Sequence, residues 1–326
     1  MRLRLFSLLI PSACESGAIA LEDKGAAGTD STPVDDTGTD GSDSVPADDT
    51  GTDSTGTDDT TDTTDTTDPG TTTTPCAAYG LVAEEALTLA EGTQVDGWSS
   101  ALGGYGGANS QQPSMIAVNA AGSCAANIGG VVTGDVWIGA GADPATAACF
   151  GWGGSVSGAV QVLAAPVPIE TPVAPGLPAG TAPLRASWGE TLRLDADQSV
   201  TGFTVEYGSA VEVLRSITVL VEGDLAIDGA TVTIAPGERL ELFVTGAVRI
   251  GWGAWVNTDG EPAQLSIRML GGDLVMDSGS YASADIRSGG GQFSNNGGQF
   301  YGSWSGARLG SAWGAGFHLD EASICP

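Results

Sequence analysis

The chain contains very little lysine and histidine, and these shortages exclude several kinds of chemistry. Lys24 is its single lysine and His318 its single histidine. Residues 76–326 have no lysine, which excludes lysine bases and Schiff-base nucleophiles from that region. A Ser-His-Asp triad would depend on His318, and residues 302–306 (GSWSG) carry Trp where a nucleophile elbow needs Ser. We therefore expect no enzyme activity, although glycoside hydrolysis by paired carboxylates stays open.

Long apolar runs are also missing, and the one short run lies at the start of the chain. Arg2 and Arg4 precede the apolar residues 5–13, which are too few to span a bilayer. This pattern predicts an export signal over residues 1–20. Cys14 follows Ser and Ala as in a bacterial lipoprotein box, while residues 18–20 (AIA) fit ordinary signal peptidase, and an uncleaved start is a third reading. We expect lipid attachment at Cys14 and an outer-membrane or cell-surface location, with a secreted or periplasmic protein as the alternative.

Positive charge is scarce throughout, and the formal net charge is −29. Residues 21–75 repeat Thr and Asp with almost no large apolar side chains, which predicts a disordered acidic linker. The remaining residues, 76–326, are long enough for one domain and are also acidic. Nucleic acid is therefore excluded as a partner, and a cation or a basic partner fits the charge better.

Cysteines are few, and their number suits an oxidising compartment. Four remain after Cys14, namely Cys76, Cys124, Cys149 and Cys325. An even number in an exported protein predicts two disulfides. We predict Cys124–Cys149, because that spacing matches one structural repeat, and Cys76–Cys325, which would need the chain to double back.

An internal repeat dominates the domain. It reads apolar, any, Gly, Asp or Ala, apolar, any, apolar at residues 132–138 (VTGDVWI), 156–162 (VSGAVQV), 221–227 (VEGDLAI), 244–250 (VTGAVRI) and 270–276 (LGGDLVM). Alternating apolar residues indicate short strands with one face inward, and Gly marks a corner. Neighbouring copies begin 23 to 26 residues apart. Such a period is typical of a solenoid, so we predict a right-handed parallel β-helix. An antiparallel β-sandwich is the alternative, and the Pro-rich residues 164–187 are predicted to leave the repeats as a surface excursion.

The register of the repeat predicts which side chains point inward. The corner glycines are Gly134, Gly158, Gly223, Gly246 and Gly272, and the inward residues are Val136, Ile138, Val160, Val162, Leu225, Ile227, Val248, Ile250, Leu274 and Met276. The outward residues, which would form any binding surface, are Trp137, Gln161, Ala226, Arg249 and Val275.

Two sets of side chains are candidates for binding. Asp135, Asp224 and Asp273 follow corner glycines, where they would either stabilise the turn or form a calcium-binding row. Eight aromatic residues stand mostly beside glycine: Trp98, Tyr105, Trp137, Trp152, Trp252, Trp255, Trp304 and Trp313. Trp137, Trp252 and Trp304 are the candidate sugar-stacking residues, and the alternative is that such rings cap the core.

Both ends of the domain resemble a known group of proteins. Residues 95–100 (VDGWSS), 103–106 (GGYG) and 317–322 (FHLDEA) resemble a bacterial domain family of unknown function found in exported and pilus-assembly-related proteins. The resemblance implies a parallel β-helix with a role at the cell surface or envelope. It singles out His318 and Asp320, which would close the last turn through hydrogen bonds or, alternatively, serve a metal or catalytic site.

These observations give three functional hypotheses. The leading one is a non-enzymatic, envelope-anchored structural or adhesive module that contacts other envelope proteins. The second is a β-helix that binds or cleaves polysaccharide, and the third is a surface module that depends on calcium.

Overall fold

The computed structural model of the chain describes residues 79–324, which form a solenoid of about nine turns. Every pairing between named strands in this region is parallel, and antiparallel contacts occur only as isolated bridges in the residue 97–112 region. The predicted parallel β-helix is therefore confirmed, and the sandwich is excluded. The predicted export signal with Cys14, the linker 21–75, Cys76 and Cys325 lie outside the described residues.

The first part of the solenoid, the N-terminal winding (residues 81–162), contains nine strands and two short helices. The strands are β1 (Leu81–Leu89), β2 (Gln94–Trp98), β3 (Ser114–Val118), β4 (Ala126–Ile128), β5 (Val131–Val132), β6 (Gly134–Ile138), β7 (Ala148–Phe150), β8 (Ser155–Val156) and β9 (Val160–Val162). The helices are η1 (Ser100–Leu102) and α1 (Pro144–Ala147).

The second part, the C-terminal winding (residues 184–324), is longer and holds the remaining strands. These are β10 (Leu184–Ala186), β11 (Thr191–Leu194), β12 (Gln198–Val200), β13 (Phe203–Val205), β14 (Ala210–Val213), β15 (Ile217–Val221), β16 (Leu225–Ile227), β17 (Thr231–Ile234), β18 (Leu240–Val244), β19 (Val248–Ile250), β20 (Trp255–Val256), β21 (Leu265–Met269), β22 (Leu274–Asp277), β23 (Tyr281–Ser288), β24 (Gln292–Asn296), β25 (Gln299–Ser311) and β26 (Gly316–Asp320). The short helices are η2 (Pro262–Gln264) and α2 (Glu321–Ile324).

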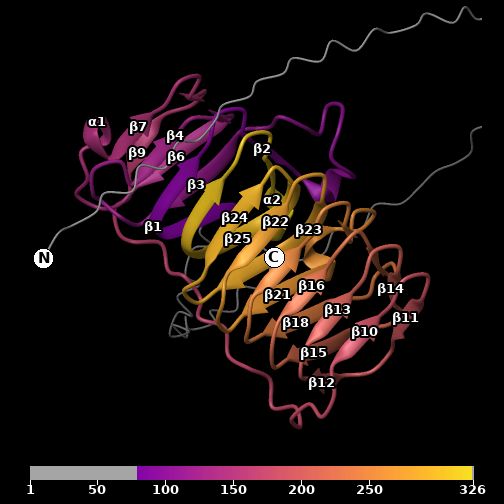
Figure 1. Cartoon of the computed structure of the whole chain (residues 1–326). Helices are drawn as coiled ribbons and strands as arrows, with labels where there is room; N and C mark the ends of the chain where they lie inside the picture. Colours follow the sequence, from indigo (N-terminus) through magenta and orange to yellow (C-terminus); the bar gives the residue numbers. More distant parts are fainter. Residues whose placement is uncertain (1–78, 325–326) are drawn as a thin grey trace, which may run out of the picture. The chain divides into compact units, whose positions relative to one another are not determined.

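The turns do not stack in chain order. β1 pairs with β3 and β4 on one side and with β25 on the other, and β2 likewise lies between β5 and β26. The chain thus enters the solenoid in the middle, winds to one end at β9, restarts at the opposite end at β10 and winds back to meet its own beginning. Figure 1 shows the yellow strand β25 beside the indigo β1. We call the contact of β1 and β2 with β25 and β26 the seam.

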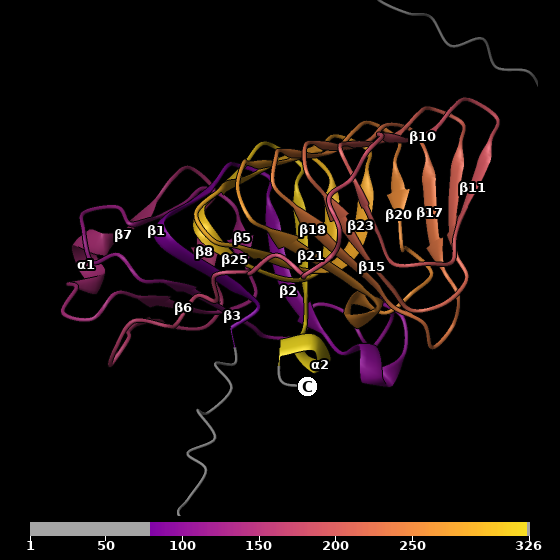
Figure 2. The same cartoon turned by 90° about the horizontal axis from the view of Figure 1, so that it is seen from below.

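The excursion predicted over residues 164–187 ends at residue 183, because Leu184–Ala186 form β10. Residues 164–183 carry the chain from one end of the solenoid to the other, as Figure 2 shows in rose. This excursion is held near its start by an amide clamp, in which Val167 N donates to Asn119 Oδ1 (2.8 Å) and Asn119 Nδ2 donates to Val167 O (2.8 Å). Near its other end, Gly180 N donates to Glu222 Oε2 at 3.2 Å. Its proline-rich composition suits this extended path, because proline fixes φ and leaves one backbone donor fewer to satisfy.

Apolar side chains fill the solenoid in rows that cross the seam. Ile286 of β23 pairs with Trp304 of β25, which pairs with Leu81 of β1 and through it with Ile116 of β3. All four residues are buried. The inward register predicted from the repeat is confirmed for eight of the ten residues, which are at most 3% exposed. Val160 and Val162 are only partly buried, because β9 is a terminal strand with a neighbour, β6, on one side only.

The Gly-Asp corners follow from contacts between successive turns. Ala247 N donates to Asp224 Oδ1 (2.8 Å) and Ala159 N to Asp135 Oδ1 (2.7 Å), so each aspartate binds the backbone of the next turn. A Cβ atom on Gly246 would lie 2.3 Å from Asp224 Oδ1. Glycine is required there because the aspartate of the preceding turn occupies the space of a side chain.

One predicted disulfide lies among the described residues. Cys124 and Cys149 are bonded, with Cα atoms 5.0 Å apart. The adjacent strands β4 and β7 pair Asn127 with Cys149, which brings the two cysteines of successive turns together. The prediction for this pair is confirmed.

Candidate functional site

An aromatic cleft of about 540 Å³ lies on the outer surface beside the seam. Five rings line it: Trp98, Tyr105, Trp255, Tyr281 and Tyr301. They come from both windings, because Trp98 ends β2 and Tyr105 follows η1, while the other three lie on β20, β23 and β25. The cleft therefore lies where the first strands of the solenoid meet its last strands.

Strand register places the rings of the C-terminal winding. Trp255 is paired with Tyr281, and their ring centroids are 4.8 Å apart. The neighbouring residues Val256 and Ala282 are buried, so alternation turns Trp255 and Tyr281 outward. Tyr301 follows the buried Phe300 in the same way, so its ring also lies on the outer face.

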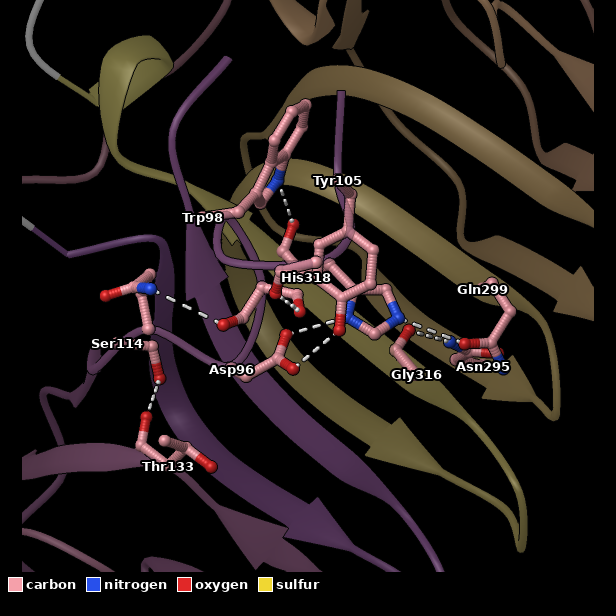
Figure 3. Close-up of polar contacts among 12 residues, drawn as sticks. Asp96, Trp98, Tyr105, Ser114, Thr133, Asn295, Gln299, Gly316 and His318 are labelled. Atoms are coloured by element: carbon pink, nitrogen blue, oxygen red, sulfur yellow. Dashed lines mark hydrogen bonds and ion pairs between the residues drawn. The ribbon is translucent and has the colours of Figure 1, made fainter. Parts of the chain in front are cut away.

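A buried histidine, His318, contacts Tyr105 of the cleft, and Figure 3 shows its polar contacts. His318 Nδ1 is 2.7 Å from Asp96 Oδ1, and its Nε2 is 3.1 Å from Gln299 Oε1. The imidazole lies between two tyrosine rings, with centroid distances of 4.2 Å to Tyr105 and 4.7 Å to Tyr301. With every polar atom of the ring bound, His318 serves here to hold the wall of the cleft.

The same network fixes the loop that carries Tyr105. The Tyr105 hydroxyl donates to Asp96 Oδ2 (2.7 Å), and Trp98 Nε1 donates to His318 O (3.1 Å). Asp320 accepts from Ser100 N and from Ser100 Oγ, each at 2.8 Å, and so pins η1. His318 and Asp320 thus close the final turn through hydrogen bonds, as one of the two sequence hypotheses expected.

Two tyrosines of the cleft, Tyr105 and Tyr301, have raised pKa values. Burial, together with the hydrogen bond to Asp96, raises the pKa of Tyr105. Burial and the nearby Tyr281 and Asp96 raise the pKa of Tyr301. Asp259 and Glu261 line the cleft with exposed side chains. The cleft offers flat rings, neutral hydroxyls and acidic acceptors, a combination suited to an uncharged ligand rich in hydroxyl groups.

The three predicted sugar-stacking residues have different environments. Trp252 is 65% exposed, so its ring is available to a ligand. Trp304 is 1% exposed inside the solenoid, and that prediction is wrong, because Trp304 occupies an inward position of β25. Trp137 points outward as predicted, but it packs against Val82, Ala117, Leu163 and Val167 beneath the excursion, which leaves its ring in a packing role.

The three aspartates proposed as a calcium-binding row do not form one. Asp224 and Asp273 are two turns apart, with Ala247 at the position between them, and Asp135 belongs to the other winding. Asp273 Oδ1 accepts from Gln292 N at 2.9 Å, so all three carboxylates bind the backbone of a neighbouring turn. Within residues 79–324, no group of three or more His, Cys, Asp or Glu side chains is arranged to hold a metal ion. His318 and Asp320 therefore do not belong to such a group.

Sequence reasoning identified part of the cleft. Trp98, Tyr105 and Trp255 stood out as aromatic residues near glycine, whereas Tyr281 and Tyr301 did not. A usable signal existed for one of them. Tyr281 follows Gly279 by two positions just as Trp255 follows Gly253, and this shared spacing places both on one row.

Comparison with known proteins adds little to this picture. No known family matches the sequence, and no curated protein matches it. Among solved structures, the ice binding protein from an Antarctic bacterium Flavobacteriaceae is similar at 11% identity and a TM-score of 0.26. The similarity covers 74% of this chain and 79% of that one. At this level it carries no argument about function, and the family resemblance seen in the sequence stays a prediction.

The described residues contain no helix that is long and apolar enough to cross a membrane.

Proposed function

We propose that this domain is a non-catalytic binding module of an exported protein and that its aromatic cleft binds an uncharged glycan. The observation that supports this most directly is the convergence of five aromatic rings on one cleft of about 540 Å³. Sugars present apolar faces that stack on aromatic rings and hydroxyls that need hydrogen-bonding partners. Tyr281, Tyr301 and the rim carboxylates offer both kinds of contact.

Charge narrows the class of glycan. Residues 79–324 contain 24 acidic side chains against eight arginines, and Asp259 and Glu261 lie on the cleft itself. An acidic polysaccharide would be repelled. The proposal is therefore restricted to neutral glycans, held by a surface or envelope protein as an adhesive contact.

The test measures binding of neutral hexasaccharides of β-1,4-glucose, β-1,4-N-acetylglucosamine and β-1,3-glucose by isothermal titration calorimetry. Trp255→Ala and Tyr281→Ala should each weaken binding about tenfold, which corresponds to about 1.4 kcal/mol. Phe150→Ala is the matched control, since Phe150 is 51% exposed on β7 and does not line the cleft. An oligomer of alginate should not bind.

Two outcomes would overturn the proposal. Full-strength binding in Trp255→Ala and Tyr281→Ala would place the glycan elsewhere. Release of reducing sugar from a bound glycan, abolished by Glu261→Gln, would replace the non-catalytic assignment with glycoside hydrolysis, for which the rim pair Asp259 and Glu261 supplies the required kind of residue.

A further inference from the structure

One corner of the solenoid repeats the same backbone conformation across both windings. Another set of glycines, the ridge glycines, occupies the position two residues before a continuous row of paired strand residues: Thr191, Ala210, Thr231, Trp255, Tyr281, Gln299, Gly316, Gln94, Val131 and Ser155. Nine of these ten glycines have positive φ, namely Gly189, Gly208, Gly229, Gly253, Gly279, Gly297, Gly314, Gly92 and Gly153. The row is unbroken across the seam, so this corner is a single line on the surface.

Exposed aromatic residues directly precede the ridge glycine in five of the turns. We call this set the aromatic ridge: Trp188, Tyr207, Trp252, Trp313 and Trp152. Their exposed fractions are 75%, 61%, 65%, 75% and 84%. Large apolar side chains this exposed are ordinary when scattered, but aligned on one edge they mark an interaction surface.

The rings are held in place by the glycines of the neighbouring turn. A Cβ atom on Gly208 would lie 2.9 Å from Trp188 Nε1, and one on Gly92 would lie 2.6 Å from Trp313 Nε1. Tyr207 covers Gly229 and Trp252 covers Gly279 in the same manner. Each of these rings rests on a glycine, while most of its surface stays open to solvent. A platform ordered in this way loses little entropy on binding.

The spacing of the ridge is set by the solenoid. Trp188 and Tyr207 are one turn apart, and Tyr207 and Trp252 are two turns apart. Three turns separate Trp252 from Trp313, and three more separate Trp313 from Trp152. With a strand spacing of about 4.8 Å, the gaps are roughly 5, 10 and 14 Å, and the ridge extends roughly 43 Å. The rings are separated by whole numbers of solenoid turns. Such regular spacing suits a stiff polymer whose own units repeat at regular distances.

The ridge passes the mouth of the cleft. Trp252 lies three residues before Trp255, and Gly279, which Trp252 covers, lies two residues before Tyr281. Glu91 and Asp228 occupy ridge positions on turns without a ring, which disfavours an acidic polymer.

We propose that the aromatic ridge binds the surface of an insoluble neutral polysaccharide, whose chains lie along the solenoid and pass over the cleft. This inference rests on the proposed function for its ligand class. It adds a second binding site, the ridge, which a polymer contacts but a short oligosaccharide bound in the cleft does not.

The experiment separates the two sites with one triple variant and two kinds of ligand. Trp152, Trp188 and Trp313 are all changed to Ala, which leaves Trp252 and the cleft intact. Depletion isotherms are measured on suspensions of cellulose, chitin and β-1,3-glucan, and calorimetry is repeated with the soluble hexasaccharides. The triple variant should lose at least tenfold in affinity for the polymer, while its hexasaccharide affinity changes less than twofold.

Two further variants control for folding and for ring chemistry. A second triple variant carries Tyr at the three positions and should retain polymer affinity within about threefold, because a ring is still present. Phe150→Ala should bind the polymer as the wild type does. Thermal unfolding of each variant shows whether the solenoid is intact.

The outcomes identify which idea fails. Unchanged polymer binding in the Ala triple variant overturns the ridge and leaves the cleft proposal standing. Loss of polymer binding in that variant, with no effect of Trp255→Ala on either ligand, overturns the cleft and retains the ridge. A wild type that binds neither ligand overturns both. A change in self-association in the triple variant, seen by analytical ultracentrifugation without any effect on polymer binding, would assign the ridge to a second copy and overturn the inference.

Discussion

Both windings carry the same repeat, but interior and terminal turns differ in how fully the fold encloses it. In the C-terminal winding, inward pairs such as Leu225 and Ile227 are almost fully buried between two neighbouring turns. In the N-terminal winding, Val136 and Ile138 of an interior turn are also buried, whereas Val160 and Val162 of the terminal turn are only partly buried. The N-terminal winding also has a disulfide and a patch of its outer face covered by the excursion. A repeat sequence therefore specifies the shape of a turn, while its place in the stack decides how much that turn contributes to stability.

The seam gives the sharpest test of whether the windings are one cooperative unit. Trp304 is buried between Ile286 of the C-terminal winding and Leu81 of the N-terminal winding, so its side chain joins the two windings. Trp304→Ala should lower the free energy of unfolding by about 3–5 kcal/mol, through lost burial and the cavity left behind. Urea titration followed by circular dichroism measures this. Trp152→Ala, at 84% exposure, is the control and should cost less than about 0.5 kcal/mol. Two separate transitions in the wild type would show that the windings unfold independently.

Corner glycines test the difference between interior and terminal turns. An alanine Cβ would meet an aspartate Oδ1 at 2.3 Å on Gly246 and at 2.1 Å on Gly158, so the local clash is similar. Gly246 lies between two other turns, whereas Gly158 is on the terminal one. We expect Gly246→Ala to cost about 2–3 kcal/mol and Gly158→Ala about 1 kcal/mol, because the terminal turn can shift. Equal losses in urea titrations would contradict the distinction.

The smallest expected effect concerns Tyr105, which the N-terminal winding places against His318 of the C-terminal winding. The pKa of Tyr105 is raised by burial and by its hydrogen bond to Asp96. The folded state therefore keeps a proton that the unfolded state loses above about pH 10, so stability falls as pH rises from there toward the folded pKa. Tyr105→Phe should cost about 1 kcal/mol or less at pH 7 and should flatten this alkaline decline. Urea midpoints measured from pH 8 to 11 check this, with Tyr207→Phe as the exposed control. An unchanged slope would show that Tyr105 does not titrate as inferred.

Much of each turn was predictable from local sequence. Alternating apolar residues around Gly223 and Gly246 gave the strands and their inward faces, since side-chain direction in a strand has a period of two. The spacing of Cys124 and Cys149 gave the disulfide for a similar reason, because one repeat separates equivalent positions on successive turns. Trp304 was assigned to the wrong face because its strand, β25, lacks the repeat that set the register elsewhere.

The order of the turns could not be predicted in the same way. Parallel turns with the same alternating pattern can pair with any other such turn, so the repeat does not say that β1 lies beside β25. That choice depends on packing between residues distant in sequence, such as Trp304 on Leu81, and on an excursion long enough to reach the opposite end. The aromatic cleft and the unbroken ridge depend on the same choice, because both cross the seam. The sequence by itself determined the form of a single turn, and only the tertiary structure decided which turns are neighbours, because strand pairing is a non-local interaction.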